Sequence, residues 1–165
     1  MPPERKRNSY QLLMDLVRLG GLLQKTGNEF FRGRGLTQAQ FNTLMVLMYT
    51  RPMGCRQNEL CELLLVKPAN VTGLVGRLHE RGLVTRKVDS SDERARLVSI
   101  SAKGRKLIRK VEPDYYGEID KIMAVLGTPE VKGFSESVAK VQASTIDRGL
   151  LSHFGLRKEN SGGAR

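Results

Sequence analysis

Apolar residues recur every three to four positions along several stretches of this chain, which is the spacing of one helix face. Residues 10–31 show such a pattern, rich in leucine, and a glycine-containing break follows at 33–35. The spacing predicts a long helix over 10–31. In LTQAQF, residues 36–41, Thr37 can cap a second helix and Gln40 can bond back to the cap, so a helix is predicted from there to about Arg51.

Two shorter apolar patterns come next, separated by a turn. Residues 57–65 (QNELCELLL) carry leucines on one side and predict a short helix. After VKPA, a stripe runs from Pro68 to Arg81, with Pro68 suited to the first turn and Gly82 to the position just past the helix end. The stripe consists of Val71, Leu74, Val75 and Leu78. Two short helices joined by a tight turn predict a helix-turn-helix.

The stretch RKVDSSDERARLVSIS, residues 86–101, has a different pattern. Two strand-like runs, RKV and RLVSI, lie on either side of an insert rich in charge and turn formers. They predict a two-stranded hairpin with Arg94 and Arg96 near its tip. The predicted fold class is therefore mainly α with a small β-hairpin wing, a winged helix-turn-helix, in one domain of 165 residues.

The charge changes the picture from fold to partner. The formal net charge is +11, and residues 51–110 hold 14 Lys and Arg against 6 Asp and Glu, whereas residues 111–150 hold 4 against 7. A segment this basic indicates a polyanionic partner, of which nucleic acid is the commonest. An acidic membrane surface is the alternative, but it requires a basic amphipathic helix with aromatic anchors, and aromatic residues are only 5% of the chain.

In a helix-turn-helix the N-terminal residues of the second helix face base edges in the major groove. The polar and small residues beside the apolar stripe are therefore candidate DNA contacts, and Arg94 at the hairpin tip suits a narrow minor groove. An alternative role for Arg77 is an ion pair with Glu80 or Glu59. The predicted DNA-binding residues are Lys67, Asn70, Thr72, Gly73, Arg77, Arg86, Arg94 and Arg96.

The run NVTGLVGRLHERGLVTRKVDSSDERARLVSISAKG, residues 70–104, and the upstream LTQAQFNTLMVL resemble the MarR (multiple antibiotic resistance regulator) family of bacterial transcription regulators. The resemblance covers about residues 10–150 and is most specific in the wing. It implies that Asp92 holds the wing by pairing with Arg86 and that Arg94 enters the minor groove. It further implies a homodimer that binds a pseudo-palindromic operator on double-stranded DNA, as a ligand-responsive repressor.

The same resemblance assigns the outer helices to dimerisation and residues 37–100 to the DNA-binding lobe. A helix is expected from Ala102 to about Leu126, bent near Pro113, and another from Thr128 to about Leu151, so residues 10–31 and 102–151 form the dimerisation part. The tail, 152–165, has no apolar stripe and is expected to be disordered. Apolar residues expected to be exposed without a partner are Leu12, Leu16, Leu19, Leu23, Ile146, Leu150 and Leu151.

Two departures from the family pattern keep alternatives open. Gly73 and Gly76 stand where relatives often carry larger polar side chains, and Arg56 stands where a capping Ser or Thr is common. Specificity is then expected to rest more on groove shape and on the wing than on side chains of the recognition helix. A low-specificity architectural protein for DNA or RNA is the alternative function.

Sites for small molecules have less support in the sequence. The resemblance implies a small aromatic or phenolic anion as effector, and its candidate pocket residues, for which plain core is the alternative, are Phe41, Met45, Met48, Tyr115 and Tyr116. Cys55 and Cys61, in what reads as helical sequence, are interpreted as small hydrophobes, with a thiol-based redox-sensing regulator as the alternative. No metal site is predicted.

No catalytic constellation is found in the sequence, and no enzyme is predicted. The chain shows no nucleophile paired with His and an acid, no glycine-rich phosphate loop and no cofactor motif. It has no run of 18 apolar residues and no apolar stretch after its basic start. The expected location is the cytoplasm.

Overall fold

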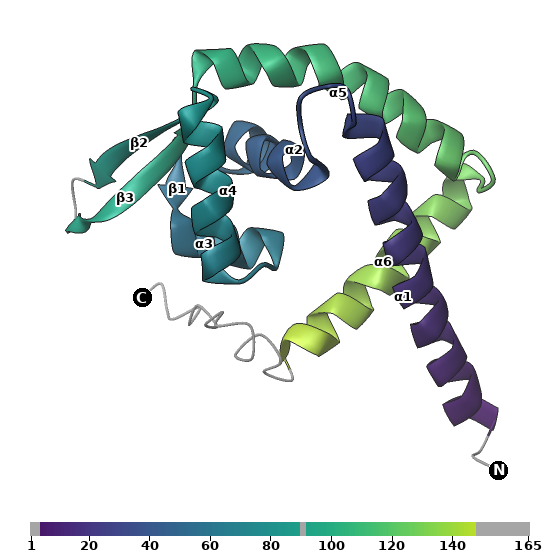
Figure 1. Cartoon of the computed structure of the whole chain (residues 1–165). Helices are drawn as coiled ribbons and strands as arrows, with labels where there is room; N and C mark the ends of the chain where they lie inside the picture. The colour runs from purple at the N-terminus through teal and green to yellow at the C-terminus, as the bar shows by residue number, and fades with distance from the viewer. Residues whose placement is uncertain (1–3, 90–91, 148–165) are drawn as a thin grey trace. The chain divides into compact units, whose positions relative to one another are not determined.

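The structure is a computed structural model that describes the backbone of residues 4–89 and 92–147, and the side chains of these ranges except 92–95 and 147. It is mainly helical with one small sheet, as predicted (Figure 1). The chain divides into two compact units, up to residue 41 and from residue 42 onward. The elements are α1 Glu4–Phe31, α2 Gln38–Met45, η1 Val46–Thr50, β1 Cys55–Arg56, α3 Gln57–Leu64, α4 Pro68–Glu80, β2 Val84–Asp89, β3 Asp92–Ile100, α5 Ala102–Met123 and α6 Thr128–Asp147.

The first helix is longer than its apolar pattern predicts. Helix α1 starts at Glu4 and not at residue 10, because its polar first turns contain no proline or glycine that would stop it. Most of its side chains are exposed, and only Gly27 and Phe31 are buried. The Phe31 ring packs on Phe30, with centroids 5.0 Å apart, and on Phe41 at 4.7 Å.

The start of α2 confirms the predicted capping box. The backbone N–H of Gln40 donates to Thr37 Oγ1 at 3.2 Å, and the N–H of Thr37 donates to Gln40 Oε1 at 3.1 Å. The helix predicted to reach about Arg51 instead ends as an α-helix at Met45. A π-helical turn, η1, continues it, closed by the Arg51 N–H donating to the Val46 carbonyl at 2.8 Å.

The wing is part of a three-stranded antiparallel sheet in the order β1-β3-β2. The observed sheet is larger than the predicted two-stranded hairpin in two respects. Both strands extend into the charged insert, leaving residues 90 and 91 between them, and β1 adds a third strand in which Cys55 pairs with Val98. Cys55 therefore lies in a strand and not in a helix, because two residues are too few to show an alternating pattern.

Helices α3 and α4 form the predicted helix-turn-helix, and their apolar faces contribute to the core of the second unit. Leu60 and Cys61 of α3 are buried, as is the whole stripe of α4. The end of α4 is confirmed: Gly82 takes a φ of +68° and the N–H of Leu83 donates to the Leu78 carbonyl at 2.9 Å. The turn between the helices places Leu65 in the left-handed region, with a φ of +53°.

Helices α5 and α6 complete the second unit. Ser101 caps α5, since its Oγ accepts from the Gly104 N–H at 3.0 Å. Pro113 lies inside α5, and Figure 1 shows the helix axis changing direction along its length, as predicted. Helix α5 ends at Met123, short of the expected limit near Leu126, and α6 is described as far as Asp147, so its expected end near Leu151 lies outside the described residues. The expected apolar contacts at 150 and 151 and the tail at 152–165 lie outside the described residues.

Candidate nucleic-acid interface

Helix α4 has two contrasting faces. Its stripe of four apolar residues is buried against the lobe, while Lys67, Asn70, Thr72, Gly73 and Arg77 are exposed. The Thr72 hydroxyl donates to the carbonyl of residue 68 at 3.1 Å, within the helix itself. The first turn of α4 contains a proline and no acidic residue, so the N-terminal end of the helix carries no negatively charged side chain. This exposed face suits a polyanion.

Two arginine guanidinium groups lie beside the glycines of α4. A Cβ built on Gly73 would be 3.4 Å from Arg77 Nη1, and one on Gly76 would be 3.8 Å from Arg86 Nη2. Both distances are ordinary van der Waals contact, so neither glycine is required by crowding. Arg77 makes no ion pair with any described residue, and Glu59, one of its suggested partners, lies instead 3.4 Å from Arg51.

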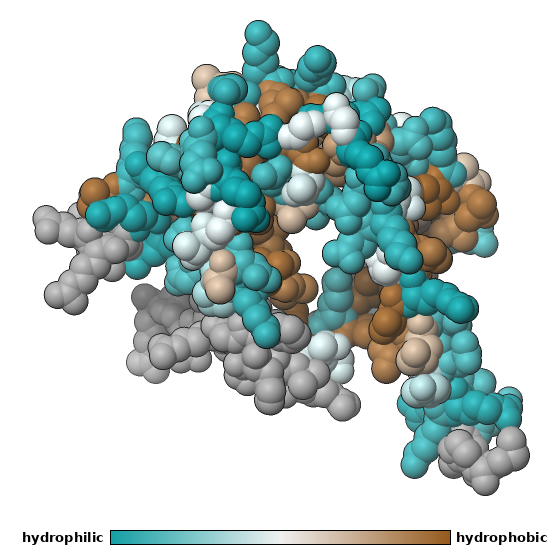
Figure 2. All heavy atoms as spheres, viewed as in Figure 1, coloured by the Kyte–Doolittle hydropathy of each residue, from teal (hydrophilic) through white to brown (hydrophobic). Residues whose placement is uncertain are grey.

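The wing brings Arg86 next to the recognition helix. In the sheet Arg86 stands opposite Val98, and Arg96 stands opposite Val88, and both arginines are exposed. The side chains of 92–95 lie outside the described residues, so the predicted pairing of Asp92 with Arg86 and the role of Arg94 stay predictions. Figure 2 shows a mostly hydrophilic surface on the side of the molecule that carries the wing.

One structural pair in the wing was missed from the sequence. Asp89, at the end of β2, is 7% exposed, and its Oδ2 accepts from Arg56 Nε at 2.7 Å. The residues are 33 positions apart in the sequence. Sequence spacing alone gave no signal for this contact.

Much of the positive charge of residues 51–110 lies on α5 and not on the helix-turn-helix. Of the net +8 in residues 51–110, five charges come from α5, which has no acidic residue among 101–111. The Lys103 ammonium donates to the Arg81 carbonyl at 2.8 Å, at the C-terminal end of α4. Helix α4 has 13 residues and is therefore about 20 Å long at 1.5 Å per residue. The basic residues of α5 start at the C-terminal end of α4, about that distance from its N-terminal end. The five residues are Lys103, Arg105, Lys106, Arg109 and Lys110.

The predicted effector residues differ in how far they are buried. Phe41 is buried and packs on Phe31, Met45 and Met48 are half-buried, and Tyr116 is exposed. The Tyr49 hydroxyl donates to both carboxylate oxygens of Glu112, at 2.6 and 2.8 Å, a bond that raises the pKa of Tyr49. Burial and the neighbouring Glu112 carboxylate raise the pKa of Tyr116.

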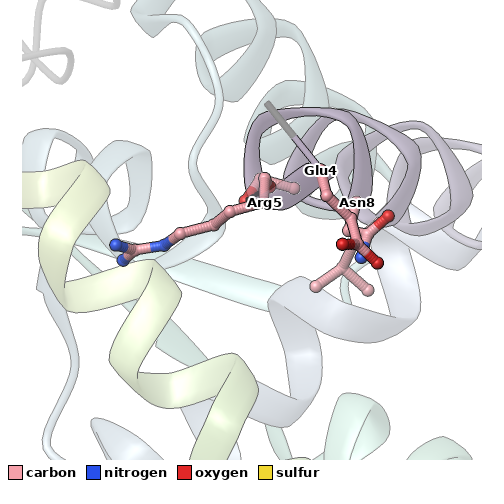
Figure 3. A pocket seen from close by; sticks show the side chains of 5 residues that line it. Glu4, Arg5 and Asn8 are labelled. Carbon is pink, nitrogen blue, oxygen red and sulfur yellow. Dashed lines mark hydrogen bonds between the residues drawn. The ribbon is translucent and has the colours of Figure 1, made fainter. Parts of the chain in front are cut away.

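Surface hollows are present on α1. Figure 3 shows one of them, in which Arg5 extends away from Glu4 and Asn8. The lining residues all come from a single helix and are exposed, so they cannot enclose a ligand. The two hollows are lined by Glu4, Arg5, Asn8, Ser9 and Leu12, and by Gln11, Met14, Asp15, Val17 and Arg18.

Both cysteines are buried and free of disulfides. Burial, reinforced by the charge of Glu59, raises the pKa of the Cys55 thiol from 9.0 to about 11. Burial also raises the pKa of Cys61, whose Sγ lies 3.1 Å from the Gln57 carbonyl oxygen. Because the thiolate is the reactive form, both thiols are poor nucleophiles at neutral pH, which disfavours the redox-sensing alternative.

The other site classes find no support in the described part of the chain. Across residues 4–89 and 92–147, no three His, Cys, Asp or Glu side chains come together in a group that could hold a metal ion. Over the same ranges, none of the helices combines the length and apolar character needed to cross a membrane. A helix with an exposed polar face beside a basic β-hairpin defines the class of winged helix-turn-helix proteins.

Comparison with known proteins finds a family model and named relatives that this chain resembles. The model of the MarR family matches residues 34–95. The transcriptional activatory protein BadR of Rhodopseudomonas palustris is 34% identical over 116 residues, 66% of this chain and 65% of BadR. The transcriptional repressor YetL of Bacillus subtilis is 25% identical over 115 residues, 70% of this chain and 69% of YetL.

A solved structure agrees in fold. The MarR-family regulator Sco3205 of Streptomyces coelicolor, crystallised in complex with DNA, superposes with a TM-score of 0.74 at 17% identity, covering 83% of this chain and 86% of Sco3205. The comparisons therefore agree with the resemblance to the MarR family of transcription regulators. The resemblance inferred from the wing and the preceding helices is confirmed.

Proposed function

We propose that the protein is a homodimeric transcription regulator that binds a pseudo-palindromic operator on double-stranded DNA, with α4 in the major groove and the wing along the minor groove. The observation that carries the proposal is the division of α4 into a buried apolar stripe and an exposed face without acidic residues in its first turn, next to Arg86 of the wing. Sco3205, a protein of the same fold, was crystallised in complex with DNA, which supports DNA binding as the function.

Each proposed contact has a distinct task. Lys67 at the start of α4 suits a phosphate, which fixes position without reading sequence. Asn70 and Arg77 carry the hydrogen-bonding groups that read base edges, an amide for adenine and a guanidinium for guanine. Arg94 of β3 is assigned to the minor groove. Thr72, Gly73, Arg86 and Arg96 complete the proposed interface, with Asp92 as support for the wing.

The dimer is proposed from the apolar surface of α1. Leu12 is 56% exposed and Leu23 41%, and apolar residues in this amount and at helical spacing are typical of an interface. We assign residues 10–31 and 102–151 to dimerisation and 37–100 to DNA binding. Two recognition helices about 34–36 Å apart would then face one side of a duplex.

The dimer proposal is tested by light scattering on size-exclusion chromatography. Leu12→Glu together with Leu19→Glu should convert the protein to a monomer. Operator binding should weaken as well, because a monomer contacts only one half-site and so makes half of the contacts. Met53→Glu, at a residue that is 89% exposed outside α1, is the control and should stay dimeric. A double variant that remains a dimer would refute the assignment of α1.

The DNA contacts are tested by fluorescence anisotropy with an operator duplex. Arg94→Ala and Arg77→Ala should each weaken operator binding by roughly tenfold or more, about the loss expected for one base or groove contact, without a change in melting temperature. Equal affinity in the Arg94 variant would remove the wing from the mechanism.

A second candidate function is low-specificity architectural binding of nucleic acid. It is favoured by Gly73 and Gly76, which remove two side chains from the proposed reading face of α4. It predicts equal affinity for operator and scrambled duplex. We prefer the dedicated regulator because the relatives of known name are transcription regulators.

Regulation by a ligand, with repression released by a small aromatic or phenolic anion, is the remaining part of the proposal. Met45, Met48, Tyr115 and Tyr116 are the candidate contacts, together with Phe41. We further propose that the protein acts in the cytoplasm, and that it regulates and does not catalyse. Soaking or titration with salicylate as a probe, followed by anisotropy on the operator complex, tests the ligand response.

A further inference from the structure

The carboxylate of Asp89 is buried at a place where the wing is otherwise exposed. Along β2, residues 85–88 are exposed to solvent, and Asp89 follows with only 10% of its side-chain surface accessible. Its Oδ2 accepts a hydrogen bond from Arg56 Nε at 2.7 Å and forms an ion pair with Nη2 of the same guanidinium at 2.6 Å. A buried carboxylate requires such a partner, because an unpaired charge away from water is strongly unfavourable.

Arg56 is itself held at the start of α3. It ends strand β1, where it stands opposite Leu97, and it is the residue that caps α3. Its backbone N–H donates to Glu59 Oε1 at 3.2 Å, and Glu59 Oε2 lies 3.4 Å from Arg51 Nε. A guanidinium has no acceptor atom, so Arg56 cannot cap the helix with its side chain as Ser or Thr does. Its side chain serves the wing instead.

The sheet is irregular at the same position. The register of β2 and β3 shifts between Val88 and Asp89, so that Asp89 stands opposite Asp92. A bulge disrupts the ladder of backbone hydrogen bonds and lets the strand bend. The backbone hydrogen bonds between β2 and β3 therefore hold the outer end of the wing least at Asp89. This is the residue that the Arg56 side chain contacts.

We propose that the Arg56–Asp89 pair positions the wing: it fastens the outer end of β2 to the start of α3, and thereby fixes the distance between the wing tip and the recognition helix. Arg56 and Asp89 are positioning residues and need not touch DNA. The proposal rests on the proposed function, since it assumes that α4 and the wing engage neighbouring grooves together. A wing that moves freely must be ordered on binding, which lowers affinity.

The sharpest test uses the opposite charges of the two residues. Arg56→Ser removes a positive charge and Asp89→Asn removes a negative one, so a pure charge effect on DNA binding would have opposite signs. The positioning role predicts the same sign: each variant should weaken operator binding about tenfold, and the double variant should be no weaker than the worse single variant, because one contact is lost in all three. Lys106→Ser, which removes one charge from α5, is the control and should bind within about twofold of wild type.

Loss of folding is separated from loss of position by the double variant. Arg56→Ser alone leaves the buried Asp89 carboxylate without its partner and should lower the melting temperature, whereas Arg56→Ser with Asp89→Asn leaves no unpaired charge and adds a favourable Ser cap, so it should melt near wild type. Reduced affinity of the double variant at an undiminished melting temperature therefore indicates a displaced wing. If the Arg56 variant weakens binding and the Asp89 variant strengthens it, the pair acts through charge and the proposal is wrong.

Amide hydrogen exchange without DNA supplies the independent measurement. In both single variants the amides of Val88 and Arg96 should exchange faster than in wild type, while those of the buried stripe of α4 keep their rates. Unchanged exchange in the wing overturns the proposal, whatever the affinities. If wild type fails to distinguish operator from scrambled duplex but the wing still loosens in both variants, the proposed function fails and the tie between Arg56 and Asp89 stands.

Discussion

Gly104, the third residue of α5, offers a direct test of how the wing strands join the long helix. A Cβ at this position would lie 2.2 Å from the carbonyl oxygen of Leu83 and 2.9 Å from Ile100 Cγ1. That oxygen is fixed, because it accepts from the Ser101 N–H at 3.0 Å. Gly104→Ala must therefore displace backbone, and not merely the end of a flexible side chain.

The expected magnitude follows from three contributions. Overpacking of a tight site costs about 1–3 kcal/mol, and weakening of the Ser101 to Leu83 hydrogen bond costs about 1 kcal/mol. Replacing glycine by alanine in a helix returns roughly 0.5–1 kcal/mol. The net prediction is a free energy of unfolding lowered by about 1–3 kcal/mol, which corresponds to a melting temperature roughly 3–10 °C lower for a chain of this size.

The same helix supplies a matched control. Gly117 is exposed, and a Cβ there would have no other atom within 4 Å. Gly117→Ala should therefore raise the free energy of unfolding by roughly 0.5–1 kcal/mol. Both variants are compared with wild type by thermal and urea denaturation at one protein concentration, because a dimer melts at a temperature that depends on concentration. A Gly104 variant as stable as wild type, or shifts of equal sign in both variants, would refute the packing described at the start of α5.

Three further predictions address other parts of the molecule. Iodoacetamide should modify Cys55 in the folded protein far more slowly than a free thiol, because with a pKa of about 11 roughly one thiol in 10⁴ is ionised at pH 7; rapid labelling in mass spectrometry would show that the site opens. Leu65→Asn should stabilise the protein by about 0.5–1 kcal/mol, because Asn tolerates the left-handed region better than Leu, and a lower melting temperature would contradict this. Lys106→Gln with Lys110→Gln should leave the salt slope of operator binding unchanged, whereas Lys67→Gln, at the proposed phosphate contact, should reduce its magnitude by about 0.9; a reduction in the α5 variant as well would place α5 at the DNA.

Local rules predicted the parts of the fold that depend on near neighbours in sequence. The capping box of Thr37 and Gln40 and the end of α4 at Gly82 follow from single-turn geometry, and both are present as expected. The buried stripe of α4 follows from helical spacing. These features need no knowledge of the rest of the chain.

Contacts between distant segments were the ones missed. Strand β1 is two residues long and exists only because Val98 of β3 lies beside it. The ion pair of Arg56 with Asp89 requires that same sheet to form first. The net charge of residues 51–110 follows from the sequence alone. Its division between the DNA-binding lobe and α5 depends on where each element starts. Sequence spacing contains no such information.

The measurement that tests the central claim most directly is fluorescence anisotropy of the purified protein across a salt series. One duplex carries the region upstream of the protein's own gene, and the other is a scrambled duplex of equal length. If the protein is a sequence-specific regulator, we expect its affinity for the native duplex to exceed that for the scrambled duplex by a factor of about 10³ or more. We also expect a steep salt slope, near −0.9 per phosphate contact. Equal affinity for both duplexes would contradict sequence-specific regulation at this site, and absence of binding to either would contradict the DNA interface itself.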